Sequence, residues 1–241
     1  MPQNKTITRK LIFLLLGLLI LYLFTKNGNF FPVFFAIASL ILIYKCKAAD
    51  KKEDIKNLLI GVVLAILSLH PIYGICIVLG YVAAHRVFDN SNNKILVFPK
   101  EKKEILVYGL LPTFFLILLN SIWMVQSTPI NFSLSLIAIT GSLIASIPEE
   151  LLFRYLLFAV CVNIGNDRDF SKLQNLICYL ILIVPHVLMH FPAGTTITLI
   201  DFGLMSVFGI TLAYIQRKSS LTLAIIVHFL IDFFRFMIFG G

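Results

Sequence analysis

Charged residues are scarce in this sequence. They make up only 13% of its 241 residues, whereas 59% are hydrophobic, and the mean hydropathy is +0.94. Soluble domains carry about a quarter charged residues and about half apolar ones. Because a soluble chain of this length could not bury so much apolar surface, the composition argues against soluble protein classes. It predicts an integral membrane protein.

Several short motifs are also missing. No CxxC pair occurs, and the four cysteines are irregularly spaced. This pattern is typical of small apolar side chains rather than of a disulfide framework. There is no HExxH, so the usual zincin helix is absent. The GxSG and GxGD signatures of rhomboid-like and presenilin-like enzymes are absent as well. Any chemistry must therefore come from other residues.

The net charge of +8 is gathered in short basic runs between apolar stretches. Two lysine-rich loops, 45–57 and 86–104, fit the positive-inside rule better than a nucleic-acid surface, so we expect no nucleic-acid partner. Basic residues also precede the first apolar stretch, and no small-residue cleavage site follows it. We therefore expect an uncleaved first span with the N-terminus in the cytoplasm. The Lys-, Ile- and Asn-rich usage is typical of an AT-rich genome, which favours a bacterial peptide-processing role, and we expect the protein in a bacterial plasma membrane.

The apolar stretches predict an all-α fold, a polytopic transmembrane helical bundle of about eight spans. The stretch 58–84 contains His70-Pro71, and proline disrupts a helix interior. It is one kinked span or a hairpin of two short helices. We favour the hairpin because it leaves both lysine-rich loops in the cytoplasm. We expect a single membrane domain over 1–241, with N-terminal spans in 1–131 and the motifs in 132–239. The candidate spans are 11–25, 30–45, 58–84, 105–125, 132–164, 173–190, 196–215 and 221–239.

Ionisable side chains inside apolar stretches are the most informative feature. Each costs about 2.5–3.5 kcal/mol near the bilayer centre. Such residues are therefore retained when they form ion pairs or take part in the function of the protein. Three lie close together in the stretch 132–164. Glu150 and Arg154 are four residues apart and can pair on one helix face. Glu149 points about 100° away from Glu150 around the helix. If the Glu150–Arg154 pair serves only in packing, the charge of Glu149 has no explanation.

Two further stretches carry histidines. His186 and His190 share one helix face, and His228 shares a face with Asp232. The carboxylate could orient the imidazole, or it could pair with Arg235 and leave the histidine without a role. Helices of a bundle can bring such residues to one pocket. Glutamate and histidine can activate a water molecule, and carboxylate and histidine can also bind a divalent metal such as zinc. Both possibilities stay open.

The three motifs, in their order, resemble those of a known family. The EExxxR run that begins at Glu149, a later histidine and the HxxxD run that begins at His228 resemble EExxxR, FxxxH and HxxxN or HxxxD. These are the motifs of the CPBP family, the CAAX-processing and bacteriocin-processing intramembrane proteases also called Abi proteins. The resemblance covers roughly residues 132–239.

This resemblance implies a role for each matching residue. It implies that Glu149 activates the attacking water, with Glu150 as its neighbour, and that Arg154 supports the helix. For the second motif, His190 fits best, since it precedes Phe191-Pro192. The resemblance also implies that the HxxxD residues, His228 and Asp232, help to stabilise the developing oxyanion.

Two departures from the family pattern bear on the site. The FxxxH motif ending at His190 needs Phe at position 186, where this chain has His186, and a register of Leu182 and His186 is the alternative. In addition, an ionised Asp232 cannot donate to an oxyanion as asparagine could. It then orients His228, or is itself protonated in an apolar site.

The leading hypothesis is an intramembrane endopeptidase that hydrolyses a peptide bond of a membrane-associated protein or peptide. The expected partners are that substrate and the lipid bilayer. The alternative is a non-catalytic membrane immunity or scaffold protein that uses its buried charges for packing. A proton-relaying transporter ranks last because no inverted repeat is present.

Overall fold

The structure, a computed structural model, describes residues 2–25, 30–48, 50–166, 168–191 and 198–240. These residues are 80% helical and contain no strand, which confirms the all-α prediction. In the part of the chain described, the only extended pairing is an isolated bridge between Leu96 and Ser220. The elements are α1 (Pro2–Thr25), α2 (Phe31–Lys45), α3 (Lys51–Leu67), α4 (Gly74–Asp89), α5 (Lys102–Glu104), η1 (Ile105–Leu110), α6 (Leu111–Met124), α7 (Leu136–Pro148), η2 (Glu149–Leu156), α8 (Leu157–Gly165), α9 (Lys172–Met189), α10 (Leu199–Lys218) and α11 (Leu221–Phe239).

Six helices of the described chain are long and apolar enough to cross a membrane. Two of them are continuous through a π-helical segment, so that α5, η1 and α6 form one rod and α7, η2 and α8 form another. The helix α2 is apolar but shorter, with 15 residues. The polytopic bundle is therefore confirmed, and the predicted count of about eight spans is approximate. The spans are Asn4–Leu23, Lys102–Met124, Leu136–Gly165, Lys172–Met189, Leu199–Lys218 and Leu221–Phe239.

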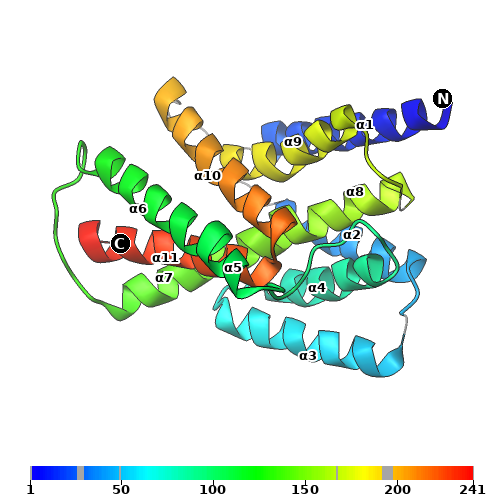
Figure 1. The fold of residues 1–241 in the computed structure, drawn as a ribbon, viewed down its shortest axis with the longest axis horizontal. Coiled ribbons are helices and arrows are strands. Elements are labelled where there is room, and N and C mark those ends of the chain that lie inside the picture. Colours follow the sequence, from blue (N-terminus) through cyan, green and yellow to red (C-terminus); the bar gives the residue numbers. More distant parts are fainter. Residues whose placement is uncertain (1, 26–29, 49, 167, 192–197, 241) are drawn as a thin grey trace.

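The stretch 58–84 is not one kinked helix but two helices, α3 and α4, packed against each other (Figure 1). Between them Leu69 has a φ of 51°, in the left-handed region that turns the chain. Gly61 allows the close approach, because a Cβ there would lie 3.1 Å from the Cα of Val78. Both lysine-rich loops thus lie at the same end of the pair, as the hairpin interpretation expected.

Arg86 holds the open end of this hairpin together. Its Nε and Nη2 donate to the two oxygens of Asp54 at 2.8 and 2.6 Å, and its Nη1 donates to the carbonyl of Ile43 at 2.9 Å. The hydrogen bond from Arg86 lowers the pKa of the Asp54 carboxyl below its ordinary value of 3.8. The pair is therefore fully formed at neutral pH, and its stabilisation is lost only as the pH falls through that lowered pKa.

Replacement of Arg86 by methionine is expected to lower the free energy of unfolding by about 1–3 kcal/mol, because it leaves a carboxylate and a helix-end carbonyl without their donor. Thermal unfolding in detergent measures the effect. The control is Lys56→Met, which removes an exposed pair with Glu53 and should change stability by less than about 0.5 kcal/mol. Equal effects of the two variants would contradict the role given to Arg86.

The rod of α7, η2 and α8 lies at the centre of the bundle. It is contacted by α4, α9, α10 and α11, while α1 lies along α9 on the outside (Figure 1). In η2 every residue from Glu150 to Leu156 is buried. This all-round burial places the charged motif inside protein rather than against lipid.

The π-helical geometry of η2 begins directly after Pro148. Proline has no N–H to donate to the carbonyl of Ile144, four residues earlier, so the α-helical ladder is interrupted there. Within η2, the carbonyl of Glu150 accepts a hydrogen bond from the Gln216 side chain of α10 at 3.0 Å. Short π-helical turns are frequent at functional sites. Here the turn sets the direction of the two glutamates.

Candidate active site

Glu150 and Arg154 form the buried support predicted from their spacing. Both are fully buried, and Arg154 Nη1 donates to Glu150 Oε1 at 2.5 Å. The same oxygen of Glu150 also accepts from His228 Nδ1 at 2.8 Å. The carboxylate therefore ties η2 to α11, and it accounts for the Glu150 charge without any chemistry.

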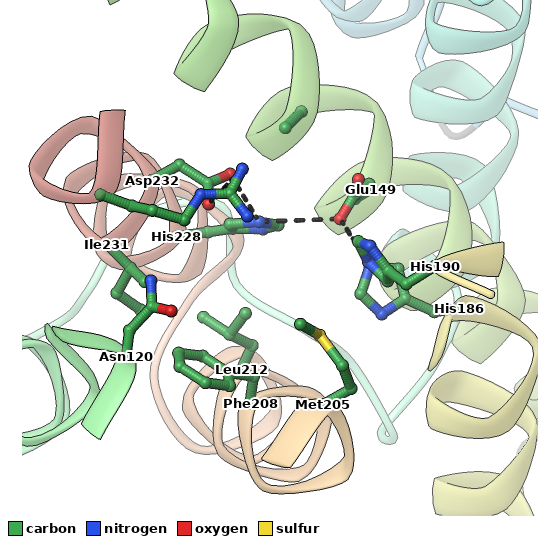
Figure 2. A pocket seen from close by; sticks show the side chains of 12 residues that line it. Asn120, Glu149, His186, His190, Met205, Phe208, Leu212, His228, Ile231 and Asp232 are labelled. Atoms are coloured by element: carbon green, nitrogen blue, oxygen red, sulfur yellow. Dashed lines mark hydrogen bonds and ion pairs between the residues drawn. The ribbon is translucent and has the colours of Figure 1, made fainter. Parts of the chain in front are cut away.

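Glu149 points away from that pair and faces three histidines. Its Oε2 lies 2.5 Å from His186 Nε2, 3.6 Å from His228 Nε2 and 3.9 Å from His190 Nε2. The histidines come from α9 and α11, and Figure 2 shows the α9 histidines beside Glu149 with His228 on its other flank. The structure thus brings together histidines that a simple topology would place at different membrane depths.

Arg154 also fixes the hydrogen-bonding role of His186. Its Nη2 lies 3.2 Å from His186 Nδ1. Because a guanidinium only donates, Nδ1 must accept, so the ring proton sits on Nε2 and is donated to Glu149. Both nitrogens of His186 are therefore engaged. His190, at the C-terminal end of α9, has a side chain that is 37% exposed and has no such constraint.

Asp232 stands between a histidine and an arginine. Its carboxylate lies 3.4 Å from His228 Nε2 and 3.7 Å from Arg235 Nη2. The two alternatives raised by the sequence, orientation of the histidine and pairing with Arg235, are thus both present, each at a long distance. The Nε2 of His228 is left between the carboxylates of Glu149 and Asp232.

These groups border a cavity of about 110 Å³. Glu149, His186, His190, His228 and Asp232 line it, whereas Glu150 and Arg154 lie behind it. The remaining walls were not identified from the sequence. They include an apolar wall from α10 and a carboxamide from α6 (Figure 2), contributed by Met205, Phe208, Leu212 and Asn120.

Asp201, the other carboxylate of these spans, is not part of the cavity. It lies in the first turn of α10, where Thr198 Oγ1 donates to it at 2.7 Å and its own N–H returns a bond to that oxygen. Thr198 is thus the N-cap of α10, and Asp201 hydrogen-bonds to it rather than to the groups of the cavity.

A divalent metal is the other chemistry suggested by these residues. Candidate ligand atoms of Glu149, His186 and His190 lie within 4.8 Å of one another. To ligate through Nε2, His186 would have to move its proton to Nδ1, where it would face the N–H of Arg154 at 3.2 Å. The donor arrangement around His186 therefore opposes metal binding at this cluster.

The fold and site define a helical membrane protein with a buried glutamate–histidine cluster beside a small cavity. Residues 131–234 match the model of the family described as type II CAAX prenyl endopeptidase Rce1-like. This match confirms the resemblance to the CAAX-type proteases over that segment, which includes η2, α9 and α11. No curated protein and no solved structure matches the chain.

The family match supports proteolysis at a membrane as the general activity, and it agrees with an integral membrane location. It covers less than half of the chain. The helices before residue 131 contribute the α3–α4 hairpin, α6 and the outer helix α1, all outside the matched segment.

Proposed function

We propose that this protein is an intramembrane endopeptidase that uses Glu149 to activate a water molecule. The observation that carries the proposal is the approach of three histidines to one carboxylate oxygen, all within 4 Å, at the edge of a cavity. Glutamate and histidine within reach of one water supply a general base and a group that orients the nucleophile.

In the proposed reaction, water held between Glu149 and His190 attacks the peptide carbonyl carbon. Glu149 takes the proton and later delivers it to the leaving amine, which balances the hydrolysis. His186 donates to Glu149 and fixes its direction, since Arg154 sets the ring tautomer. An imidazolium at His228 faces the cavity with Nε2 and stabilises the anionic intermediate.

Charge balance supports the role given to His228. The cluster holds three carboxylates, those of Glu149, Glu150 and Asp232, but only two guanidinium groups, those of Arg154 and Arg235. When His228 is protonated, the cluster holds three positive groups and three carboxylates. This balance lowers the cost of burying the charges within the membrane. It also leaves a positive N–H where an oxyanion forms.

Hydrolysis of membrane-anchored peptides tests this function directly. The purified protein in liposomes is given fluorogenic peptides with a transmembrane or farnesyl-cysteine anchor, including one of the Cys-aliphatic-aliphatic-X type. In ¹⁸O-labelled water we expect one labelled oxygen in each new carboxyl group. Binding of these peptides without cleavage of any of them would instead support the immunity or scaffold alternative.

The two α9 histidines are expected to differ when each is replaced by phenylalanine. His190→Phe should lower kcat about 100-fold and leave stability unchanged, because its ring holds only the water. His186→Phe should lower kcat and also lower the free energy of unfolding by about 1–3 kcal/mol, because two buried hydrogen bonds are lost. Kinetics and thermal unfolding of both variants measure this difference. The reverse pattern would contradict the assignment.

A further inference from the structure

Asn120 is a buried polar residue of the cavity that the family motifs do not include. It lies on α6, before the segment matched by the family model, and it is 6% exposed. Its side chain lines the cavity (Figure 2), and the carboxamide forms no hydrogen bond with the described residues. The amide is not enclosed by protein but opens on the cavity, so its donor and its acceptor are both available to a ligand that enters there.

The packing of α6 on α11 places Asn120 at the level of the third motif. The rod of α5, η1 and α6 runs in the same direction as α11, since Gly109 of η1 meets Leu223 near the beginning of α11. Beyond α6, Asn131 N–H donates to the carbonyl of Ile238 at 2.8 Å, near the end of α11. Eleven residues beyond the first contact, Asn120 therefore lies at about the height of residue 234. Figure 2 shows it across the cavity from Glu149, on the side of Ile231.

The chemistry of the cavity separates Asn120 from its neighbours. The other polar groups are charged or are imidazoles engaged with charges, and the α10 wall is apolar. A carboxamide offers both an N–H donor and a carbonyl acceptor, the same pair that a peptide group presents. It matches a neutral backbone amide better than an ionic group.

We propose that Asn120 binds a backbone peptide group of the substrate that flanks the scissile bond. This inference rests on the proposed endopeptidase function and adds a substrate-binding residue to it. Asn120 hydrogen-bonds the flanking amide across the cavity from Glu149 and so holds the reacting carbonyl in place. The α10 side chains Met205 and Phe208 cover the adjacent apolar part of the peptide.

A double-mutant cycle between enzyme and substrate tests the contact. Peptides in which either amide beside the scissile bond is replaced by an ester lack one N–H donor. One of them should be cleaved about 10- to 100-fold less efficiently by the wild type. Asn120→Leu should lower kcat/KM for the parent peptide by a similar factor, and in this variant the ester should cost less than about threefold.

The matched control is Thr113→Val, a buried polar residue seven positions earlier on the same face of α6 that does not line the cavity. It should keep the full ester effect. An Asn120→Leu variant that remains folded and shows the undiminished ester effect for both peptides would overturn the proposal.

Peptide affinity keeps this test separate from the test of proteolysis. The same amide and ester peptides are titrated against Glu149→Gln and against Glu149→Gln/Asn120→Leu, which measures binding without turnover. If the amide and ester peptides bind the double variant with equal affinity but bind Glu149→Gln with different affinities, the contact of Asn120 with the peptide is supported. This result does not depend on cleavage. If the wild type cleaves no peptide, only the endopeptidase function fails. Equal ester effects in both proteins overturn the contact.

Discussion

Replacement of Glu149 by glutamine is expected to lower kcat for a membrane-anchored peptide by about 10³- to 10⁴-fold. Glutamine keeps the volume of the side chain and can still accept the bond from His186, but it cannot take a proton from water. The fold should persist, because the Glu150–Arg154 pair and its contact with His228 are untouched. Peptide cleavage and thermal unfolding of the two purified proteins give the comparison.

A second carboxylate in a membrane span supplies the control for this variant. Asp201→Asn makes the same neutralisation in α10, where the Asp201 carboxylate accepts a hydrogen bond from the N-cap residue Thr198 outside the cavity. It should leave kcat within about threefold of the wild type. Wild-type turnover in Glu149→Gln would remove Glu149 as the base and with it the proposed mechanism.

Replacement of Arg154 by methionine is expected to lower the free energy of unfolding by about 3–5 kcal/mol. Glu150 and Arg154 are both fully buried, so the variant leaves a carboxylate inside protein with only His228 as a partner. The variant should also lose activity, because His186 Nδ1 loses the donor that sets its tautomer. Circular dichroism during thermal unfolding in detergent measures the first effect, and peptide cleavage the second.

The variant Glu150→Gln/Arg154→Met separates these two effects. Without the buried charge the protein should recover most of its stability, as buried ion pairs replaced on both sides often do. Activity should stay low, because the missing guanidinium still leaves His186 unconstrained. Recovery of both stability and activity would show that Arg154 supports the helix alone.

Spacing rules accounted for the local part of the site. The pairs Glu150–Arg154 and His228–Asp232 are both four residues apart, and a helix necessarily brings such residues to one face. The same rule left Glu149 unpaired and so identified the charge that packing does not explain. The hairpin of α3 and α4 followed from a proline and from the distribution of lysines, which are also local features.

Spacing along the chain could not predict which residues of different helices contact one another. The sequence favoured His190 for the second motif because of the residues that follow it. The direct contact of Glu149 with His186 depends instead on how η2 turns after Pro148 and on where α9 lies. Asn120 was missed because a single uncharged amide in an apolar stretch is unremarkable until its helix is seen beside α11.

The short helices on one side of the bundle affect the surrounding lipid. Helices α2, α3 and α4 have 15, 17 and 16 residues, which correspond to lengths of about 22–26 Å. The hydrocarbon core of a typical bilayer is about 30 Å thick. Where these helices meet lipid, we expect the neighbouring acyl chains to compress toward the helix length, which predicts a locally thinned bilayer along this flank.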